Sequence, residues 1–154
     1  MLSKEEKSAL NHLFWSDFRK VMRNTTSSSN KRINWLNYPT KLKHTYVRLL
    51  FNANEASLCY DVQFRDKDIQ ILFWEQLQEL KTLIESSMGC PTIWLKEYEN
   101  NEGLAISRLK WETTEYSLHN EKDWKPVQRF FKERLLEFDK FYYEYRDILI
   151  HLIK

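Results

Sequence analysis

No acidic residue lies between Asp17 and Glu55, although this stretch contains eight lysine and arginine side chains. Residues 1–54 therefore carry a net charge of +7 and residues 55–154 a net charge of −5, which together leave the chain nearly neutral at +2. Charge segregation of this kind bears on partners and on the electric field around a protein rather than on its fold. It indicates a candidate surface for an anionic partner.

Glycine, proline and cysteine are also scarce, with two, three and two residues respectively. The chain has no glycine-rich phosphate loop, no Gly-x-Ser-x-Gly and no Cys-x-x-Cys, which argues against the corresponding enzyme classes. Its four histidines are scattered and have none of the spacings of a metal site.

A restriction-type nuclease would need an acidic residue on one strand and Glu-x-Lys on the next, to hold a metal and orient water. The pair Glu79 and Lys81 falls within a helical pattern. The pair Lys110 and Glu112 has the reverse order. We therefore expect a non-enzymatic protein with no catalytic residue, no cofactor and no metal site.

The N-terminal sequence MLSKEEKSAL is too charged for a secretory signal, and no apolar run approaches the roughly 20 residues of a membrane span. We expect a cytoplasmic protein without a membrane segment. In that reducing compartment Cys59 and Cys90 are expected to serve as small apolar residues. A chain of 154 residues, 15% of them aromatic, predicts a single domain over residues 1–154 with its own core.

An N-terminal helix is predicted over residues 3–23. Ser3 and Glu6 have the spacing of a capping box, in which each side chain bonds to the other residue's backbone N–H. Apolar residues then recur at steps of three and four from Leu10 onward. Residues 24–30, NTTSSSN, carry hydroxyl and amide side chains that bond to their own backbone, which predicts a flexible surface loop.

Residues 45–89 predict a β-hairpin followed by a helix. Two runs with alternating apolar residues are separated by residues 52–55, which have the length and chemistry of a hairpin loop. If Val47 faces the core, Arg48 shares the opposite face with Asp61. These two charges would then form a solvated ion pair that contributes little to stability.

The helix of this first unit is predicted to begin at a capping aspartate, Asp66 or Asp68, and to end before Gly89. Its apolar residues recur at helical spacing throughout. Phe73 is expected to anchor this helix to the sheet.

Residues 92–154 repeat the order of hairpin and helix. Residues 114–118 are a candidate short third strand. The last helix is predicted to begin near Asn120 or Asp123 and to run toward the C-terminus. Phe130 is expected to anchor this last helix to the sheet, as Phe73 anchors the helix that follows the first hairpin.

These elements predict the α+β class, with an antiparallel sheet built from two β-β-α units, an N-terminal helix and a long C-terminal helix. Each unit has one apolar sheet face and one apolar helix stripe. Two such units can merge into one sheet with the helices on one side.

Cations alternate with aromatic and amide side chains in the segment from residue 31 to residue 48. Aromatic faces that stack on bases, beside cations that meet phosphates, are the two components of a nucleic-acid surface. In this interpretation the binding residues are Lys31, Arg32, Asn34, Trp35, Tyr38, Lys41, Lys43, Tyr46 and Arg48. In the alternative, Trp35 packs at the entry to the sheet, Asn34 caps backbone groups and the lysines are solvated.

Several short motifs are distributed over nearly the whole chain: Phe14, Trp15 and Phe18, NWLNY at 34–38, Tyr46-x-Arg48, FWEQ at 73–76, Ile106-Ser107-Arg108, NEKDW at 120–124 and the aromatic-rich last helix. With them the chain resembles the bacterial family called domain of unknown function 4268. Members of that family are often the C-terminal part of larger proteins whose first half looks like a restriction-type nuclease. The resemblance implies work near DNA. We expect no nuclease-like half within these 154 residues, and Pro39-Thr40-Lys41 stands where related chains tend to read Lys-Thr-Gly.

The leading hypothesis is a binding module whose basic, aromatic face contacts DNA, RNA or a nuclease-type protein. One alternative is a protein-interaction domain or homodimer, in which the +7 part of one copy meets the −5 part of another. A second alternative is a nuclease-related enzyme with an unrecognised site around Arg48, Asp61 and Gln63.

Overall fold

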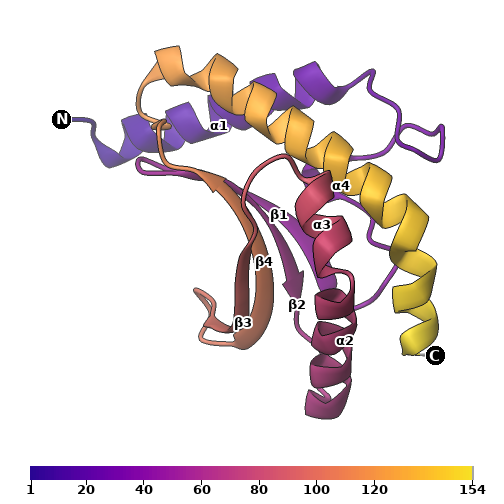
Figure 1. The fold of residues 1–154 in the computed structure, drawn as a ribbon. Helices are drawn as coiled ribbons and strands as arrows, with labels where there is room; N and C mark the ends of the chain where they lie inside the picture. The colour runs from indigo at the N-terminus through magenta and orange to yellow at the C-terminus, as the bar shows by residue number, and fades with distance from the viewer. Residues whose placement is uncertain (154) are drawn as a thin grey trace.

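The computed structural model describes residues 1–153 and contains a four-stranded antiparallel sheet with helices against one face (Figure 1). In chain order the elements are α1 (Lys4–Met22), the short 3-10 helix η1 (Trp35–Asn37), β1 (Thr45–Phe51), β2 (Ala56–Val62), α2 (Lys67–Glu79), α3 (Lys81–Ser87), β3 (Ile93–Glu99), β4 (Ala105–Thr113), the 3-10 helix η2 (Glu121–Asp123) and α4 (Trp124–Leu152). The predicted α+β class is confirmed, including the N-terminal helix and the long C-terminal helix.

Helix α1 begins at the predicted capping box. Ser3 Oγ accepts a hydrogen bond from the Glu6 N–H at 3.1 Å, and Glu6 Oε1 accepts one from the Ser3 N–H at 3.1 Å. These bonds satisfy two donors at the end of the helix that would otherwise lack partners. The inner face of α1 buries Phe14, Phe18 and Met22, so the helix packs onto the same core as the sheet.

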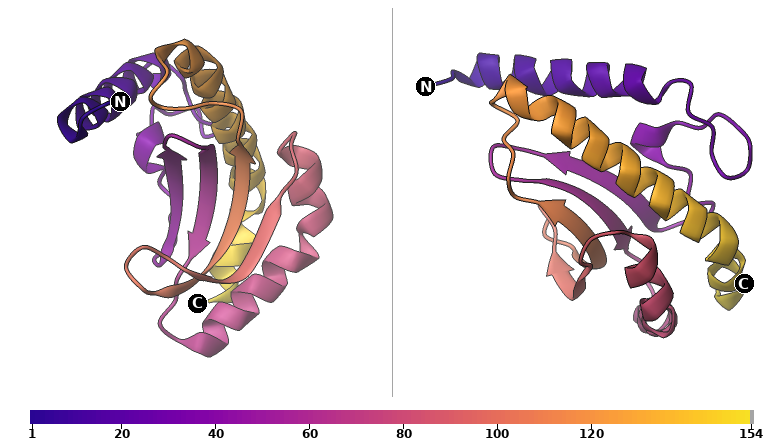
Figure 2. Two further views of the ribbon diagram at one scale, coloured as in Figure 1. Left: turned by 90° about the vertical axis from the view of Figure 1, so that its left-hand side faces the viewer. Right: turned by 45° about the horizontal axis from the view of Figure 1, so that its top comes forward.

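The two hairpins join through their second strands, which gives the strand order β1-β2-β4-β3. The hairpins of both β-β-α units therefore form one sheet, as predicted. One row of the sheet lies under the helices and contains Val47, Tyr60 and Leu109. The neighbouring row points to the helix-free face, which the left view of Figure 2 looks onto, and contains Tyr46, Asp61 and Arg108.

The helix after the first hairpin is divided into α2 and α3. Asp66 caps α2, because its carboxylate accepts hydrogen bonds from two backbone N–H groups of the first turn. The division falls at Leu80, whose ψ of 8° is outside the helical range, and it leaves Leu77 and Ile84 on either side buried. Gly89 follows α3 with φ +71°, a conformation that favours glycine and ends the helix as predicted.

The segment after β4 is not the short strand expected at residues 114–118. It turns over the loop of the first hairpin, where the Leu118 N–H donates to the Asn52 carbonyl oxygen at 3.0 Å. The buried Leu118 side chain and its carbonyl, which accepts a 2.8 Å bond from Trp124 Nε1, fix the entry to α4. The Ser117 N–H donates to Asp123 Oδ2 at 2.9 Å, so a side chain and a loop carbonyl, rather than a neighbouring strand, accept bonds from this segment. Asn120 then caps η2, close to the predicted start of the last helix.

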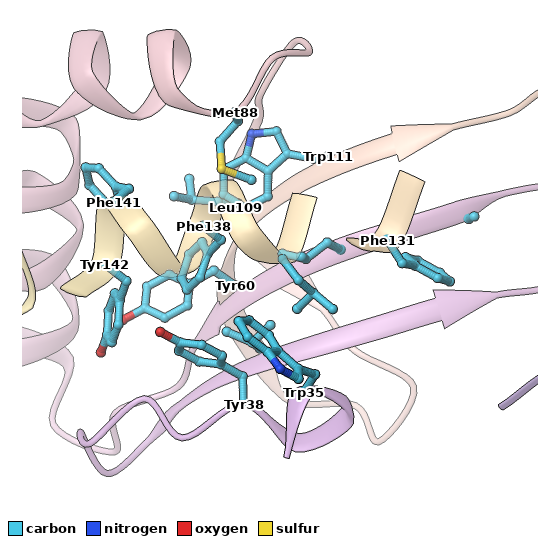
Figure 3. Packing of buried hydrophobic residues seen from close by; sticks show 14 of the residues in the cluster. Trp35, Tyr38, Tyr60, Met88, Leu109, Trp111, Phe131, Phe138, Phe141 and Tyr142 are labelled. Carbon is cyan, nitrogen blue, oxygen red and sulfur yellow. The ribbon is translucent and has the colours of Figure 1, made fainter. Parts of the chain in front are cut away.

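Helix α4 crosses the covered face of the sheet and contributes much of the core (Figure 3). Phe138 and Tyr142 stack on each other and lie against Tyr60 of β2. Phe73 on α2 is fully buried, as expected. The expected anchor Phe130 is only partly buried, and its neighbour Phe131 fills that role instead. One position along a helix turns a side chain by about 100°, so a one-residue difference changes which phenylalanine faces inward.

Within residues 1–153 no helix is both long and apolar enough to cross a bilayer. The 29 residues of α4 are long enough, but charged side chains recur along its outer face.

Candidate functional site

Trp35 and Tyr38 anchor the basic segment between α1 and β1 to the core. Only 2% of Trp35 is exposed, and its Nε1 donates to the Thr25 carbonyl oxygen at 2.9 Å. Tyr38 is also buried and lies beside α4 residues in Figure 3. Asn34 caps η1, since its Oδ1 accepts the Leu36 N–H at 3.2 Å. The packing interpretation therefore describes Trp35, Tyr38 and Asn34, and the two buried rings offer no face on which a base can stack.

Asp139 of α4 connects this segment to the last helix. Its Oδ1 accepts a 2.6 Å hydrogen bond from the Tyr38 hydroxyl, and its Oδ2 accepts a 2.7 Å bond from the Ser28 N–H. Burial, the hydrogen bond to Asp139 and the charge of Asp139 all raise the pKa of Tyr38 well above its usual range. Tyr38 therefore stays protonated and remains a donor to the buried carboxylate.

Residues 24–30, which are expected to form a flexible loop, form a hydrogen-bonded turn. The Ser27 N–H donates to the Lys31 carbonyl oxygen at 2.8 Å, and Thr26 and Arg32 form an isolated antiparallel bridge. Asn30 has φ 63°, which asparagine adopts more readily than most residues. The bond from Ser28 to Asp139 holds the turn on α4. Its mobility stays a prediction.

Between this turn and α4 lies a hollow of about 240 Å³, which we call the basic pocket. Four cations line it, together with Tyr143 and the buried Asp139; the cations are Lys31, Arg32, Lys41 and Arg146. Within residues 1–153 none of these four side chains forms an ion pair. The pocket therefore has four cations without ion-pair partners and one buried carboxylate, which leaves an excess of positive charge.

Tyr143 supplies the exposed aromatic face that the sequence interpretation assigned to Trp35. It is 44% exposed and lines the basic pocket. The guanidinium carbon of Arg146 lies 5.0 Å from the centre of its ring, which is within the range of a cation–π contact. An aromatic ring next to free cations is the arrangement that stacks on bases beside phosphates.

The other predicted binding residues lie elsewhere. Lys43 is exposed in the loop before β1 and does not line the basic pocket. Tyr46 and Arg48 are on β1 and face the helix-free side of the sheet, as the alternation predicted. The structure thus brings Lys31, Arg32 and Lys41 together and separates Tyr46 and Arg48 from them.

Arg48 does pair with Asp61, but the pair is not the solvated one expected. The exposed fraction of Asp61 is 0%, and its Oδ2 accepts a hydrogen bond from Arg48 Nη1. Arg108 from β4 binds the same carboxylate with Nε to Oδ1 at 2.7 Å and Nη2 to Oδ2 at 2.9 Å. The β2–β4 pairing places Arg108 directly beside Asp61, and the sheet buries the carboxylate between two guanidinium groups. Removing Asp61 would leave the largely buried guanidinium group of Arg108 without its partner, which costs far more than the loss of a surface pair.

Two guanidinium groups enclose Asp61, so this carboxylate is not positioned to act as a base. Burial disfavours the charge of Arg108, but the hydrogen bond to Asp61 and the neighbouring charges outweigh it and raise the pKa of Arg108 further above its usual range. Gln63 Oε1 accepts a second bond from Arg48 Nη1, at 3.2 Å. In the part of the chain that the structure describes, no three His, Cys, Asp or Glu side chains are grouped closely enough to hold a metal ion.

The residues that sequence reasoning missed are on α4 and β4. Asp139, Tyr143 and Arg146 are four and three positions apart, a spacing that places them on one face of a helix. That spacing is visible in the sequence, but it does not show that the basic segment covers this face. The contact of Arg108 with Asp61 depends on the pairing of β2 with β4, which no local pattern in the sequence indicates.

Comparison with known proteins gives one result. No curated protein and no solved structure matches this chain. The family model described as Domain of unknown function (DUF4268) matches residues 10–146, which include every strand and most of α1 and α4. The chain belongs to this family.

Proposed function

We propose that this chain is a non-enzymatic binding module that contacts the phosphate backbone of nucleic acid through the basic pocket. The observation that carries the proposal is the group of four cations without ion-pair partners among residues 1–153, lying beside the exposed ring of Tyr143. In this proposal the module works in the bacterial cytoplasm, where both DNA and RNA are present.

The chemistry of the pocket favours phosphate contacts over base readout. Lysine and arginine bound to phosphate oxygens fix a protein on nucleic acid without carrying sequence information. Each such contact releases condensed counterions, so the affinity falls steeply with salt. Tyr143 adds stacking on an unpaired base, which is tolerant of sequence. We therefore expect weak, salt-dependent binding with little sequence preference.

The fixed position of the pocket also supports the proposal. Lys31 and Arg32 follow a turn that Asp139 holds through Ser28, and Arg146 lies two helical turns along α4 from Asp139. The Asp139 carboxylate is itself buried and accepts hydrogen bonds from the Tyr38 hydroxyl and the Ser28 N–H, and within residues 1–153 it forms no ion pair with the cations of the rim. The backbone that carries these cations is therefore held before phosphates bind, and the ordering cost of binding is confined to their side chains.

The test is fluorescence anisotropy with labelled single-stranded and duplex DNA at 50 mM salt. The double substitution Lys31→Gln and Arg32→Gln should weaken binding at least tenfold, because two phosphate contacts are lost. The matched control, Lys4→Gln and Lys7→Gln, removes the same charge from the exposed first turns of α1 and should change the affinity less than twofold.

Two results would contradict the proposal. One is the absence of binding at 50 mM salt. The other is an equal effect of the two double substitutions, since that would assign binding to overall charge instead of the pocket. Sedimentation velocity addresses the alternative of self-association. If Lys31→Gln with Arg32→Gln converts a dimer to a monomer while DNA binding is absent, the basic segment serves a second copy of the chain.

A further inference from the structure

The helix-free face of the sheet carries a second hollow, which we call the arginine hollow. It has a volume of about 170 Å³ and is lined by Arg48, Leu50, Tyr98, Arg108 and the tip of the β3–β4 hairpin at residues 100–102. This hairpin tip crosses in front of the sheet in the left view of Figure 2. The basic pocket is formed with α4, which covers the other face of the sheet, so the two sites are separate.

Asp61 holds both guanidinium groups of the hollow in place. Three charge-assisted hydrogen bonds converge on its two oxygens, one from Arg48 and two from Arg108. Aromatic rings support the same groups, with Arg48 4.6 Å from the ring centre of Tyr46 and Arg108 4.5 Å from that of Tyr98. Both guanidinium planes are therefore positioned before any ligand arrives.

The remaining edges of these two guanidinium groups are donors without acceptors. Within residues 1–153 no protein hydrogen bond uses Arg108 Nη1, Arg48 Nη2 or Arg48 Nε. Asp61 is fully buried, so it offers no acceptor to a molecule in the hollow. A ligand here meets N–H groups from fixed arginines, and the group that matches them is an oxyanion.

The local charge narrows the choice of oxyanion. Arg48 and Arg108 against Asp61 leave one net positive charge. Lys110 adds little, because its Nζ is 2.9 Å from a Glu55 oxygen and 3.8 Å from a Glu112 oxygen. Glu102, on the hairpin tip, places a further negative charge at the rim. Counted together with Glu102 the hollow is close to neutral, so the directed N–H groups of the two arginines, rather than net charge, attract the ligand. Glu102 repels a doubly charged phosphate more strongly than a singly charged carboxylate.

We propose that the arginine hollow binds the carboxylate of a small organic acid. A planar carboxylate fits the edge of a guanidinium group with two parallel hydrogen bonds. A volume of about 170 Å³ lies below the usual size of drug-sized ligand sites, roughly 300 Å³ and above, which limits the ligand to a few carbon atoms. The amides of Asn100 and Asn101 at the hairpin tip border the rest of the ligand.

The experiment is a titration of the isotope-labelled full chain with butyrate, followed by two-dimensional NMR at constant ionic strength. Saturable shifts are expected for the backbone signals of Tyr98 and residues 100–102, and for the Nε–H signal of Arg108. Butyramide, a neutral molecule of the same shape, should cause none of these shifts. Inorganic phosphate should bind at least fivefold more weakly than butyrate.

The variant Arg48→Gln removes one of the two arginines and leaves both Arg108 bonds to Asp61, so the sheet retains its buried pair. Butyrate should bind it at least fivefold more weakly. Arg48→Lys keeps the charge but not the planar guanidinium group. Its affinity for butyrate should lie between those of the unsubstituted chain and Arg48→Gln. Lys4→Gln with Lys7→Gln is the control and should leave butyrate binding unchanged.

The proposal is overturned by any of three results. These are the absence of saturable shifts, equal shifts with butyramide or phosphate, and unchanged butyrate binding in both Arg48 variants. None of them bears on nucleic-acid binding at the basic pocket, which the anisotropy measurement tests independently.

Discussion

Replacing Asp61 with alanine should destabilise the protein severely, because it leaves the charge of Arg108 without its partner in the sheet. Only 8% of the Arg108 side chain is exposed, and two of its nitrogens depend on Asp61. Removing one partner of a buried ion pair costs about 3–5 kcal/mol. A domain of this size has a free energy of unfolding of about 5–15 kcal/mol, so the variant should be marginal.

Comparison with Arg48→Gln shows how much of the loss in stability comes from leaving a buried charge unpaired and how much from losing one hydrogen bond. The Arg48 side chain is 36% exposed and supplies one of the three bonds to Asp61, so its loss should cost only about 1 kcal/mol. Asp61→Asn keeps the shape and one acceptor oxygen, and its cost should lie between the two. Urea unfolding followed by tryptophan fluorescence measures all three variants. The reasoning is refuted if Asp61→Ala costs no more than Arg48→Gln.

Two further predictions concern packing around α4 and the basic segment. Phe131→Ala should cost about 3–5 kcal/mol because the ring is fully buried, whereas Phe130→Ala should cost about 1–2 kcal/mol because its ring is only partly buried; equal costs in urea unfolding would contradict this assignment. Trp35→Ala should cost about 3 kcal/mol or more by the same measurement, and a loss below about 1 kcal/mol would restore Trp35 as a stacking residue at the surface.

The elements that could be predicted from the sequence are those specified by neighbouring residues. The capping box of Ser3 and Glu6, the loop at residues 52–55 and the glycine after α3 each depend on a few adjacent positions. The strand alternation also predicted which side of β1 carries Arg48. For these features, local propensity and tertiary packing agree.

The features that could not be predicted depend on pairs of residues far apart in the chain. Arg108 reaches Asp61 from 47 positions away, and Asp139 reaches Tyr38 from 101 positions away. No spacing rule connects such residues, because the pairing of β2 with β4 and the path of α4 decide the contacts. The interleaved pattern around Trp35 fits both a binding surface and a buried anchor, and only packing distinguishes them.

The sequence pattern indicates only part of the basic pocket. The pattern of residues 31–41 indicates three of the cations, but Tyr143 and Arg146 complete the site from the far end of the chain. An aromatic residue three positions before an arginine on a helix is common, so this pattern alone indicates no particular function. The cations of residues 31–41 and the pair Tyr143 and Arg146 form one pocket only because the turn at residues 24–30 packs on α4.

The central claim is that cations of the basic pocket contact phosphates, and the salt dependence of binding tests it most directly. If all four cations engage duplex DNA, the slope of log affinity against log salt should be about −3.6, a loss on the order of a hundredfold between 50 and 200 mM. In the variant Lys31→Gln with Arg32→Gln, the slope should fall to about −1.8. An unchanged slope in this variant would show that Lys31 and Arg32 contact no phosphate and would contradict the account.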